Sequence, residues 1–242
     1  MNATARGLMK TLVLSDIHGN LAALRRVLDT QSRDRVLCLG DLVDYGPHPK
    51  ECVEFVRDQE WVTVRGNHDQ AVAALTSCRC SEAFRPLSEA TREMNCRLLG
   101  PEHTAFLGSR PLQVDVAVDG LRCRLVHATP TDPMYRYLRP TEVAAWEAEL
   151  AAVDADVLLT GHTHLPVILH VGRKIVLNPG SIGQPRDGDP RAAFAVIEDG
   201  EARLERIAYD LASTVTALAG TGLEQSVFQK LATVLQTGAK AQ

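Results

Sequence analysis

The chain has 242 residues, of which 45% are hydrophobic and 23% are charged, and its formal net charge is -4. This composition is that of an ordinary globular chain, and the length suffices for one large α/β domain with a well-buried core. Such a charge excludes a basic surface field, so we expect no nucleic acid polymer as a partner.

The first eight residues contain one arginine and no extended apolar stretch, so we expect no signal peptide. Because the fold begins naturally at residue 10, Met9 is a candidate start. We predict a single domain over 9–242 and a disordered N-terminal extension over 1–8. No segment has the ~20 apolar residues of a transmembrane helix, so we expect a cytoplasmic protein that binds no membrane.

Apolar runs in the first half of the chain alternate with helical patterns. They predict strands at 11–15, 35–39 and 61–65, a helix at 19–30, a second helix after Pro47 and Pro49, and a third starting near Asp69. This order predicts parallel strands with right-handed crossovers.

The middle of the chain, 70–108, has a helical pattern and no strand signal. Four arginines are scattered along it: Arg79, Arg85, Arg92 and Arg97. Either they form a solvated helix face, or one of them leans over the active site and binds the phosphate of the substrate. Whether 82–108 forms a lid over the substrate stays open.

The second half is rich in hairpin signals. Turn residues separate three pairs of apolar runs, which are 112–118 with 121–127, 166–170 with 174–178, and 192–198 with 201–208. They imply a second sheet with antiparallel pairs, packed on the first. The pattern at 210–236 predicts one or two amphipathic helices.

Six cysteines are present, and their pattern suits a reducing compartment. Four fall in predicted strands or on predicted helix faces, as expected of buried thiols that act as small hydrophobes: Cys38, Cys52, Cys96 and Cys123. Cys78 and Cys80 are the one close pair, and no second pair nearby indicates a zinc site. The role of this pair stays open.

Five apolar runs are each followed by residues that can bind a metal. Ligands of open α/β sheets lie beyond the carboxyl ends of the strands. If these strands lie side by side, seven oxygen and imidazole ligands converge at one edge: Asp16, His18, Asp41, Asn67, His127, His162 and His164. Seven ligands are enough for two ions, and a set without thiolate suits Mn²⁺, Fe²⁺ or Zn²⁺. Glycines directly before several of them, such as Gly66 and Gly161, let the backbone approach the site.

The ordered motifs resemble those of one known family. Asp16-Ile17-His18, Gly40-Asp41-Leu42-Val43-Asp44, Gly66-Asn67-His68-Asp69, His127 and Gly161-His162-Thr163-His164 are similar to the signature blocks of the calcineurin-like metallophosphoesterase superfamily, in its small single-domain prokaryotic branch. The resemblance spans about 11 to 191. It implies an α/β fold of two packed mixed β-sheets flanked by helices, a four-layer αββα sandwich.

The resemblance also implies a dinuclear metal centre. It assigns Asp16, His18, Asp41 and His164 to a first metal, and Asp41, Asn67, His127 and His162 to a second, so that Asp41 bridges the two. A hydroxide between the ions would attack phosphorus. We expect two divalent ions, Mn²⁺ first, with Fe²⁺, Zn²⁺, Co²⁺ or Ni²⁺ as alternatives.

His68 resembles the family's catalytic histidine, which protonates the leaving oxygen or stabilises its charge, and Asp44 resembles the carboxylate that orients it. A loop cap is the alternative role for Asp44. Candidate substrate-binding residues are Asn67, Tyr45, Arg136, Tyr137 and Arg186, the last within the turn-rich segment 178–186.

The block that ends Asp-Arg-Gly in the family's protein phosphatases reads Asp44-Tyr45-Gly46 here. Tyr45 could stack on a base, which suits a nucleotide better than a phosphoserine. We therefore expect a phosphoesterase for small molecules, namely nucleotide phosphodiesters or dinucleoside polyphosphates of the diadenosine tetraphosphate type. A protein Ser/Thr phosphatase and, more remotely, a non-catalytic scaffold are the alternatives; the oligomeric state stays open.

Overall fold

The computed structural model describes residues 9–239, so the predicted extension over 1–8 lies outside the described residues. Ten strands are present in the described part: β1 (Thr11–Leu14), β2 (Arg35–Cys38), β3 (Val62–Thr63), β4 (Gln113–Val118), β5 (Leu121–Val126), β6 (Val157–Leu159), β7 (Val167–Val171), β8 (Lys174–Asn178), β9 (Ala192–Glu198) and β10 (Glu201–Ile207).

Eight helices connect or follow these strands within residues 9–239: α1 (Leu21–Thr30), α2 (Pro49–Asp58), α3 (Asn67–Ala73), α4 (Arg85–Leu98), α5 (Pro101–Ser109), α6 (Val143–Leu150), α7 (Leu211–Ala219) and α8 (Gln225–Thr237). Their starts follow local rules. Asn20, for example, caps α1 by accepting a hydrogen bond from the Ala23 amide, and Pro49 occupies the first turn of α2.

The strands form two five-stranded mixed sheets, in the orders β10-β9-β1-β2-β3 and β4-β5-β6-β8-β7. In the first, β1 pairs in parallel with β2, and β2 with β3, as the βαβαβ order predicts. In the second, β6 lies between β5 and β8, parallel to both. The three predicted hairpins are all present.

Two expectations about the sheets are wrong. The β9–β10 hairpin joins the first sheet, where β9 pairs antiparallel with β1, and not the second. The five strands that precede ligands also do not lie side by side, because β1, β2 and β3 belong to one sheet and β5 and β6 to the other. Hairpin signals specify local pairing and contain no information on which sheet receives the hairpin.

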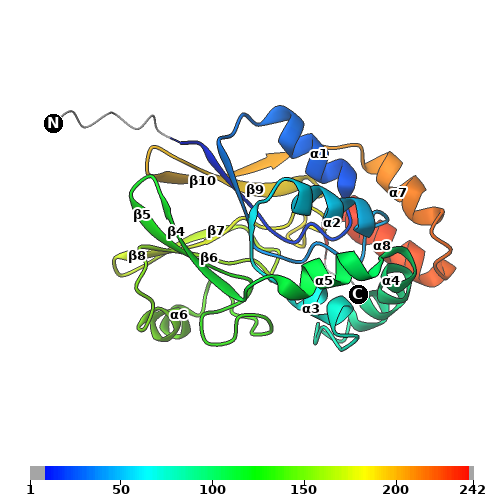
Figure 1. Ribbon diagram of the computed structural model, residues 1–242, viewed down its shortest axis with the longest axis horizontal. Helices are drawn as coiled ribbons and strands as arrows, with labels where there is room; N and C mark the ends of the chain where they lie inside the picture. The colour runs from blue at the N-terminus through cyan, green and yellow to red at the C-terminus, as the bar shows by residue number, and fades with distance from the viewer. Residues whose placement is uncertain (1–8, 240–242) are drawn as a thin grey trace.

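Four layers result, and three hydrophobic clusters hold them together (Figure 1). Leu12 and Phe194 of the first sheet pack against α1 and α2. Between the sheets, Val13 of β1 packs in one cluster with Leu125 of β5. Trp146 of α6 covers the outer face of the second sheet. The predicted αββα sandwich of two mixed sheets flanked by helices is confirmed.

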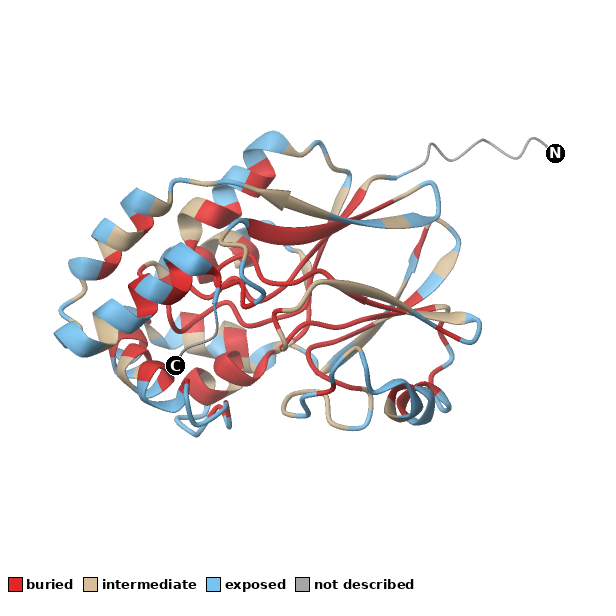
Figure 2. Ribbon diagram, turned by 180° about the vertical axis from the view of Figure 1, so that it is seen from behind, coloured by how far each residue is buried: buried red, intermediate tan, exposed pale blue. Residues whose placement is uncertain are grey.

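Helix α6 is the element that the sequence analysis did not predict. Trp146 and Leu150 are buried on it, and Val143 begins it, a spacing of three and four residues that is typical of one helix face. Within the described residues, no helix has the length and apolar character needed to cross a membrane. Figure 2 shows buried residues concentrated in the central strands and in the loops that leave them, whereas the edge strands β4, β7 and β10 are mostly intermediate or exposed.

Candidate metal centre

The loops that leave the two sheets turn sharply at the predicted metal ligands. Five of these residues have a left-handed backbone although none is glycine, with φ between 47° and 66°: Asp16, His18, Asp41, His162 and His164. A left-handed conformation is unfavourable for residues with a Cβ, and clusters of such residues are typical of functional sites. The side chains of all five residues lie in the two groups of potential ligands described next.

Glycines allow the loops to approach each other, as expected. A Cβ on Gly161 would lie 1.9 Å from the Ser15 hydroxyl, and a Cβ on Gly66 would lie 2.1 Å from Oδ1 of Asp41. Both distances are far below van der Waals contact, so no other residue fits at these two positions without moving a ligand loop.

A first group of potential ligands consists of Asp16, His18 and His164. Nε2 of His164 lies 3.2 Å from Oδ1 of Asp16 and 3.2 Å from Nε2 of His18. All three side chains are buried, and Oδ1 of Asp16 has no hydrogen-bond partner. An unpartnered buried carboxylate oxygen facing two imidazoles is the arrangement that a cation would satisfy.

A second group consists of Asp41, His127 and His162. Oδ2 of Asp41 lies 3.2 Å from Nε2 of His127 and also has no hydrogen-bond partner. Oδ1 of Asn67 completes the group, at 2.9 Å from Nε2 of His127 and 3.1 Å from Nδ1 of His162. Because Oδ2 of Asp41 is also 3.8 Å from Nε2 of His18, this carboxylate lies between the two groups.

Backbone carbonyls fix three of the imidazoles. Nδ1 of His18 hydrogen bonds to the Val43 carbonyl at 2.8 Å, and Nδ1 of His127 to the Leu39 carbonyl at 2.7 Å. Nδ1 of His164 is held in the same way by a carbonyl of the segment 178–186. With Nδ1 donating, Nε2 carries the lone pair and faces the site. This tautomer is the one that can bind a metal through Nε2.

Burial sets the charge of these groups. It lowers the pKa of His18 and of His164, and it lowers the pKa of His162 to about 3, so these rings stay neutral and free to bind a cation. Burial opposes ionisation of Asp16 and Asp41, yet the neighbouring histidines hold the pKa of both carboxyls below its usual value. Burial also opposes charge on His127, but the Asp41 carboxylate raises the pKa of His127 to about 9, so this ring must lose a proton to bind a cation. Three neutral imidazoles and two ionised carboxylates fit divalent ions.

His68 lies beside this centre and contacts Asp44. Its Nδ1 donates to Oδ2 of Asp44 at 2.6 Å. Burial disfavours the charged imidazole, but the charge of Asp41 and the hydrogen bond to Asp44 raise the pKa of His68 well above its ordinary value. The geometry therefore favours a protonated His68.

Helix α4 holds Asp44 in turn, which the sequence analysis did not anticipate. Asn95 donates from Nδ2 to Oδ1 of Asp44, and the Arg92 guanidinium lies 3.5 Å from its Oδ2. Of the four arginines considered for the middle segment, Arg92 thus contacts the site directly, although its partner is a carboxylate of the protein.

Asp69 is a second residue whose role the sequence analysis missed. Its carboxylate accepts hydrogen bonds from the backbone amides of Asp41 at 2.8 Å, Leu42 at 2.8 Å and Gly66 at 3.1 Å. It therefore ties the loop after β2 to the start of α3. The available signal was its position in the block Gly66-Asn67-His68-Asp69.

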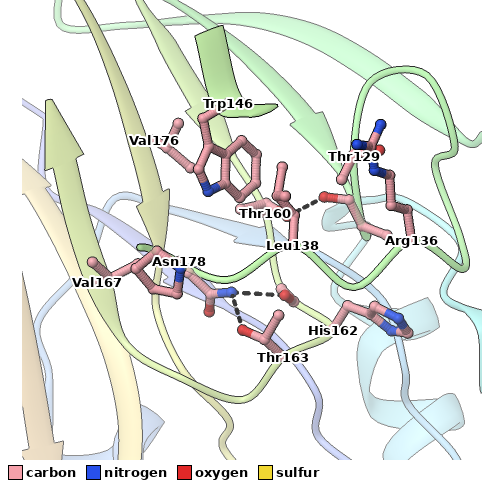
Figure 3. Close-up of a pocket in the computed structure, with 13 residues that line it drawn as sticks. Thr129, Arg136, Leu138, Trp146, Thr160, His162, Thr163, Val167, Val176 and Asn178 are labelled. Atoms are coloured by element: carbon pink, nitrogen blue, oxygen red, sulfur yellow. Dashed lines mark hydrogen bonds between the residues drawn. The ribbon is translucent and has the colours of Figure 1, made fainter. Parts of the chain in front are cut away.

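Asn178, at the end of β8, supports the loop that carries the last two histidines. Its Nδ2 donates to the Gly161 carbonyl at 2.7 Å and to the Thr163 hydroxyl at 3.1 Å (Figure 3). Figure 3 also shows His162 at one end of a small pocket that Trp146 and Leu138 line. The segment 178–186 is thus part of the structural frame of the site.

Tyr45 lies beside His68 but is only 2% exposed. Its ring packs edge-on against His18 and Phe84, and its hydroxyl is 3.4 Å from Nε2 of His68. We expected a substrate base to stack on this ring, but the ring is buried and has no face open to a base. A role in binding substrate through the hydroxyl stays a prediction.

Two of the three remaining candidates for substrate binding lie close to the centre. The Arg186 guanidinium is 3.8 Å from the Phe84 ring centroid and 5.7 Å from that of Tyr45. The Tyr137 ring stacks on His162 at 3.9 Å between centroids, with 42% of the residue exposed. Arg136 instead bonds to Glu149 at 2.5 Å, so its charge is already paired.

Matches to known proteins agree with this geometry. Residues 9–200 match the family model described as the calcineurin-like phosphoesterase superfamily domain. The chain is 34% identical to the uncharacterized protein MJ0912 of Methanocaldococcus jannaschii over 82% of this chain and 87% of that protein. It is 28% identical to the phosphodiesterase YfcE of Escherichia coli over 79% of this chain and 89% of that enzyme.

A solved structure and a nucleotide hydrolase extend the likeness. The metallophosphoesterase from Sphaerobacter thermophilus has a TM-score of 0.80 and 32% identity, covering 96% of this chain and all of that one. The symmetrical bis(5'-nucleosyl)-tetraphosphatase of Methylococcus capsulatus is 34% identical over half of this chain and 43% of that enzyme. The chain belongs to the calcineurin-like phosphoesterase superfamily. It is a hydrolase with the general phosphoesterase function of this family.

Proposed function

We propose that the chain hydrolyses small nucleotide phosphodiesters or dinucleoside polyphosphates, with two divalent ions, Mn²⁺ first among them. This proposal rests on the two groups of buried ligands that meet at Asp41, each of which has a carboxylate oxygen without a hydrogen-bond partner. Two ions held there would lower the pKa of a water molecule and neutralise charge on the phosphate oxygens.

The protein's own groups supply the remaining steps of the proposed reaction. His68, protonated and oriented by Asp44, donates a proton to the leaving oxygen. Arg186 is buried with its guanidinium beside Tyr45, close enough to this centre to offset the charge of a phosphate. The absence of bulk water around these buried groups strengthens each of these interactions.

Nucleotide specificity is proposed from one relative, because the Methylococcus enzyme is named a bis(5'-nucleosyl)-tetraphosphatase. Cleavage of a diester is proposed from another, because YfcE is named a phosphodiesterase. The exposed face of Tyr137 replaces the buried Tyr45 as the candidate surface for a nucleobase. A base stacked there would lie on the face of Tyr137 opposite His162, with the Tyr137 ring between them.

The test is a comparison of kcat/KM for three substrates with the Mn²⁺-loaded protein: diadenosine tetraphosphate, bis-p-nitrophenyl phosphate and a phosphopeptide. Symmetric cleavage to ADP, well above the other two, supports a dinucleoside polyphosphate hydrolase. Preference for the model diester supports a phosphodiesterase. Turnover of the phosphopeptide alone would overturn the proposal in favour of a protein phosphatase, and no turnover with two metals bound would indicate a scaffold.

A further inference from the structure

Cys78 and Cys80 lie in the segment 74–84 between α3 and α4, next to the proposed active site. Both are buried, with 2% and 8% of the residue exposed. Their sulfur atoms share one partner, because Sγ of Cys78 lies 3.4 Å and Sγ of Cys80 3.3 Å from the Ser88 hydroxyl. The two thiols therefore meet at one point at the start of α4.

Because both sulfur atoms approach the same Ser88 hydroxyl, the two thiols are neighbours. A hydrogen bond with Cys80, opposed by burial and assisted by a hydrogen bond with His68, lowers the pKa of the Cys78 thiol. Either of the two thiols can be the one that ionises. A disulfide forms only if the two sulfur atoms can reach each other.

The chain between the cysteines is bent in a way that suits a bridge. Arg79 has a φ of 52°, in the left-handed region, so the backbone turns between its two neighbours. Residues two apart in a bent chain fall within the roughly 4.4 to 6.8 Å between Cα atoms that a disulfide spans.

Two contacts connect this segment to the proposed metal centre. The Cys78 carbonyl accepts a hydrogen bond of 2.7 Å from Nδ2 of Asn67, which fixes the amide whose Oδ1 faces the histidines. The Arg79 guanidinium lies 4.5 Å from the Tyr135 ring centroid, and the Tyr135 carbonyl is 3.3 Å from Nε2 of His162. A shift of the segment would thus reach ligands of the second group from both sides.

We propose that Cys78 and Cys80 form an oxidative modification site, in which a hydroperoxide converts the dithiol to a disulfide that switches off the active site. One sulfur attacks the peroxide, the O–O bond breaks, and a sulfenic acid forms with release of water or an alcohol. The second sulfur then attacks the first, the S–S bond forms, and the hydroxyl leaves with the thiol proton as water. Two thiols thereby lose two electrons, which the O–O bond accepts.

Closing this bridge would move the Cys78 backbone, whose carbonyl accepts the hydrogen bond from Asn67, so the Asn67 amide would lose its partner. Loss of such a supporting hydrogen bond weakens metal affinity or activity by about 10- to 100-fold. The effect on activity rests on the proposed function, whereas the formation of the disulfide does not.

The experiment treats Zn²⁺-loaded and Mn²⁺-loaded protein with hydrogen peroxide, since Zn²⁺ has no redox chemistry of its own. We expect the peptide that contains both cysteines to lose about 2 Da, for the two hydrogens removed. Hydrolysis should fall at least about tenfold and recover with dithiothreitol. Bound metal, measured after desalting, should fall in parallel.

Two variants separate this pair from the other cysteines. Cys80→Ser should abolish both the mass loss and the recovery with dithiothreitol. Cys96→Ser, which removes the exposed cysteine of α4, should retain both. If no disulfide forms, or if it forms between other cysteines, the proposed modification site is wrong. If Cys78 and Cys80 form a disulfide but activity and metal content stay unchanged, the proposed switch is wrong. If untreated protein hydrolyses nothing, the proposed function fails, while peptide mass and metal content still decide this inference.

Discussion

The Asp69 carboxylate accepts a hydrogen bond of 2.8 Å from the backbone amide of Asp41, the residue that lies between the two ligand groups. Asp69 stands at the start of α3 and Asp41 in the loop after β2. Asp69 also accepts hydrogen bonds from two further backbone amides, so this one buried side chain fixes the conformation of the loop that carries Asp41. The candidate metal centre therefore depends on a residue that belongs to neither ligand group.

Replacing Asp69 by alanine should destabilise the protein and empty the centre. Three buried amides lose their acceptor, so we expect the free energy of unfolding to fall by roughly 3 kcal/mol or more. Urea denaturation and metal analysis would measure the two effects. Asp210 is a matched control because it accepts one amide hydrogen bond as the N-cap of α7. Asp210→Ala should cost only about 1 kcal/mol and leave metal content unchanged, and equal costs for the two variants would contradict the role of Asp69.

The pH dependence of kcat should report the contact between His68 and Asp44. The pKa of His68 is raised, so its protonated form is present at neutral pH and is lost as pH rises through that raised value. Asp44→Asn weakens the hydrogen bond that raises the pKa, which should move the alkaline limb to lower pH and reduce kcat by about 100-fold. Asp58→Asn, at an exposed position, should leave the profile unchanged. An unmoved limb in Asp44→Asn would show that another group donates the proton.

Asn95 should act on catalysis through Asp44 alone. Its amide donates to Oδ1 of Asp44, while the other carboxylate oxygen accepts from His68. Asn95→Ala frees this carboxylate to rotate, so we expect kcat to fall about tenfold with KM and metal content unchanged. Arg97→Ala, on the same helix, is the control that should change neither constant. A rise in KM without loss of kcat would instead assign Asn95 to substrate binding.

Removing the metals should lower the melting temperature. Ligands come from loops of both sheets, so ions bind the folded protein and not the unfolded chain. At a metal concentration of 100 times Kd the stabilisation is about 2.7 kcal/mol, or about 5 to 10 °C for a chain of this size. Calorimetry with and without EDTA measures it. Asp41→Asn should abolish the difference, and a metal-dependent rise that survives in this variant would argue against Asp41 as a ligand.

The sequence could indicate where the candidate ligands gather because each of them follows the end of a strand within a few residues. A buried strand has a fixed direction, so residues such as Asp16 and His127 must emerge at its carboxyl end. The hairpins were equally predictable, since Asp119-Gly120 specifies a tight turn without any tertiary information.

Contacts between residues far apart in the chain were not predictable. Asn95 and Asp44 are separated by 51 positions, and their meeting depends on how α4 packs. Burial of Tyr45 likewise depends on Phe84 and Arg186, which approach it from other elements. Local patterns report periodicity and turn chemistry, whereas these partners are decided by packing.

The left-handed backbone at the five candidate ligands lowers the stability of the folded protein. Each such residue costs roughly 1 to 2 kcal/mol relative to glycine, which adopts this conformation freely. Mutation toward glycine at Asp16 or His164 would therefore remove a metal ligand and relax the loop in the same step.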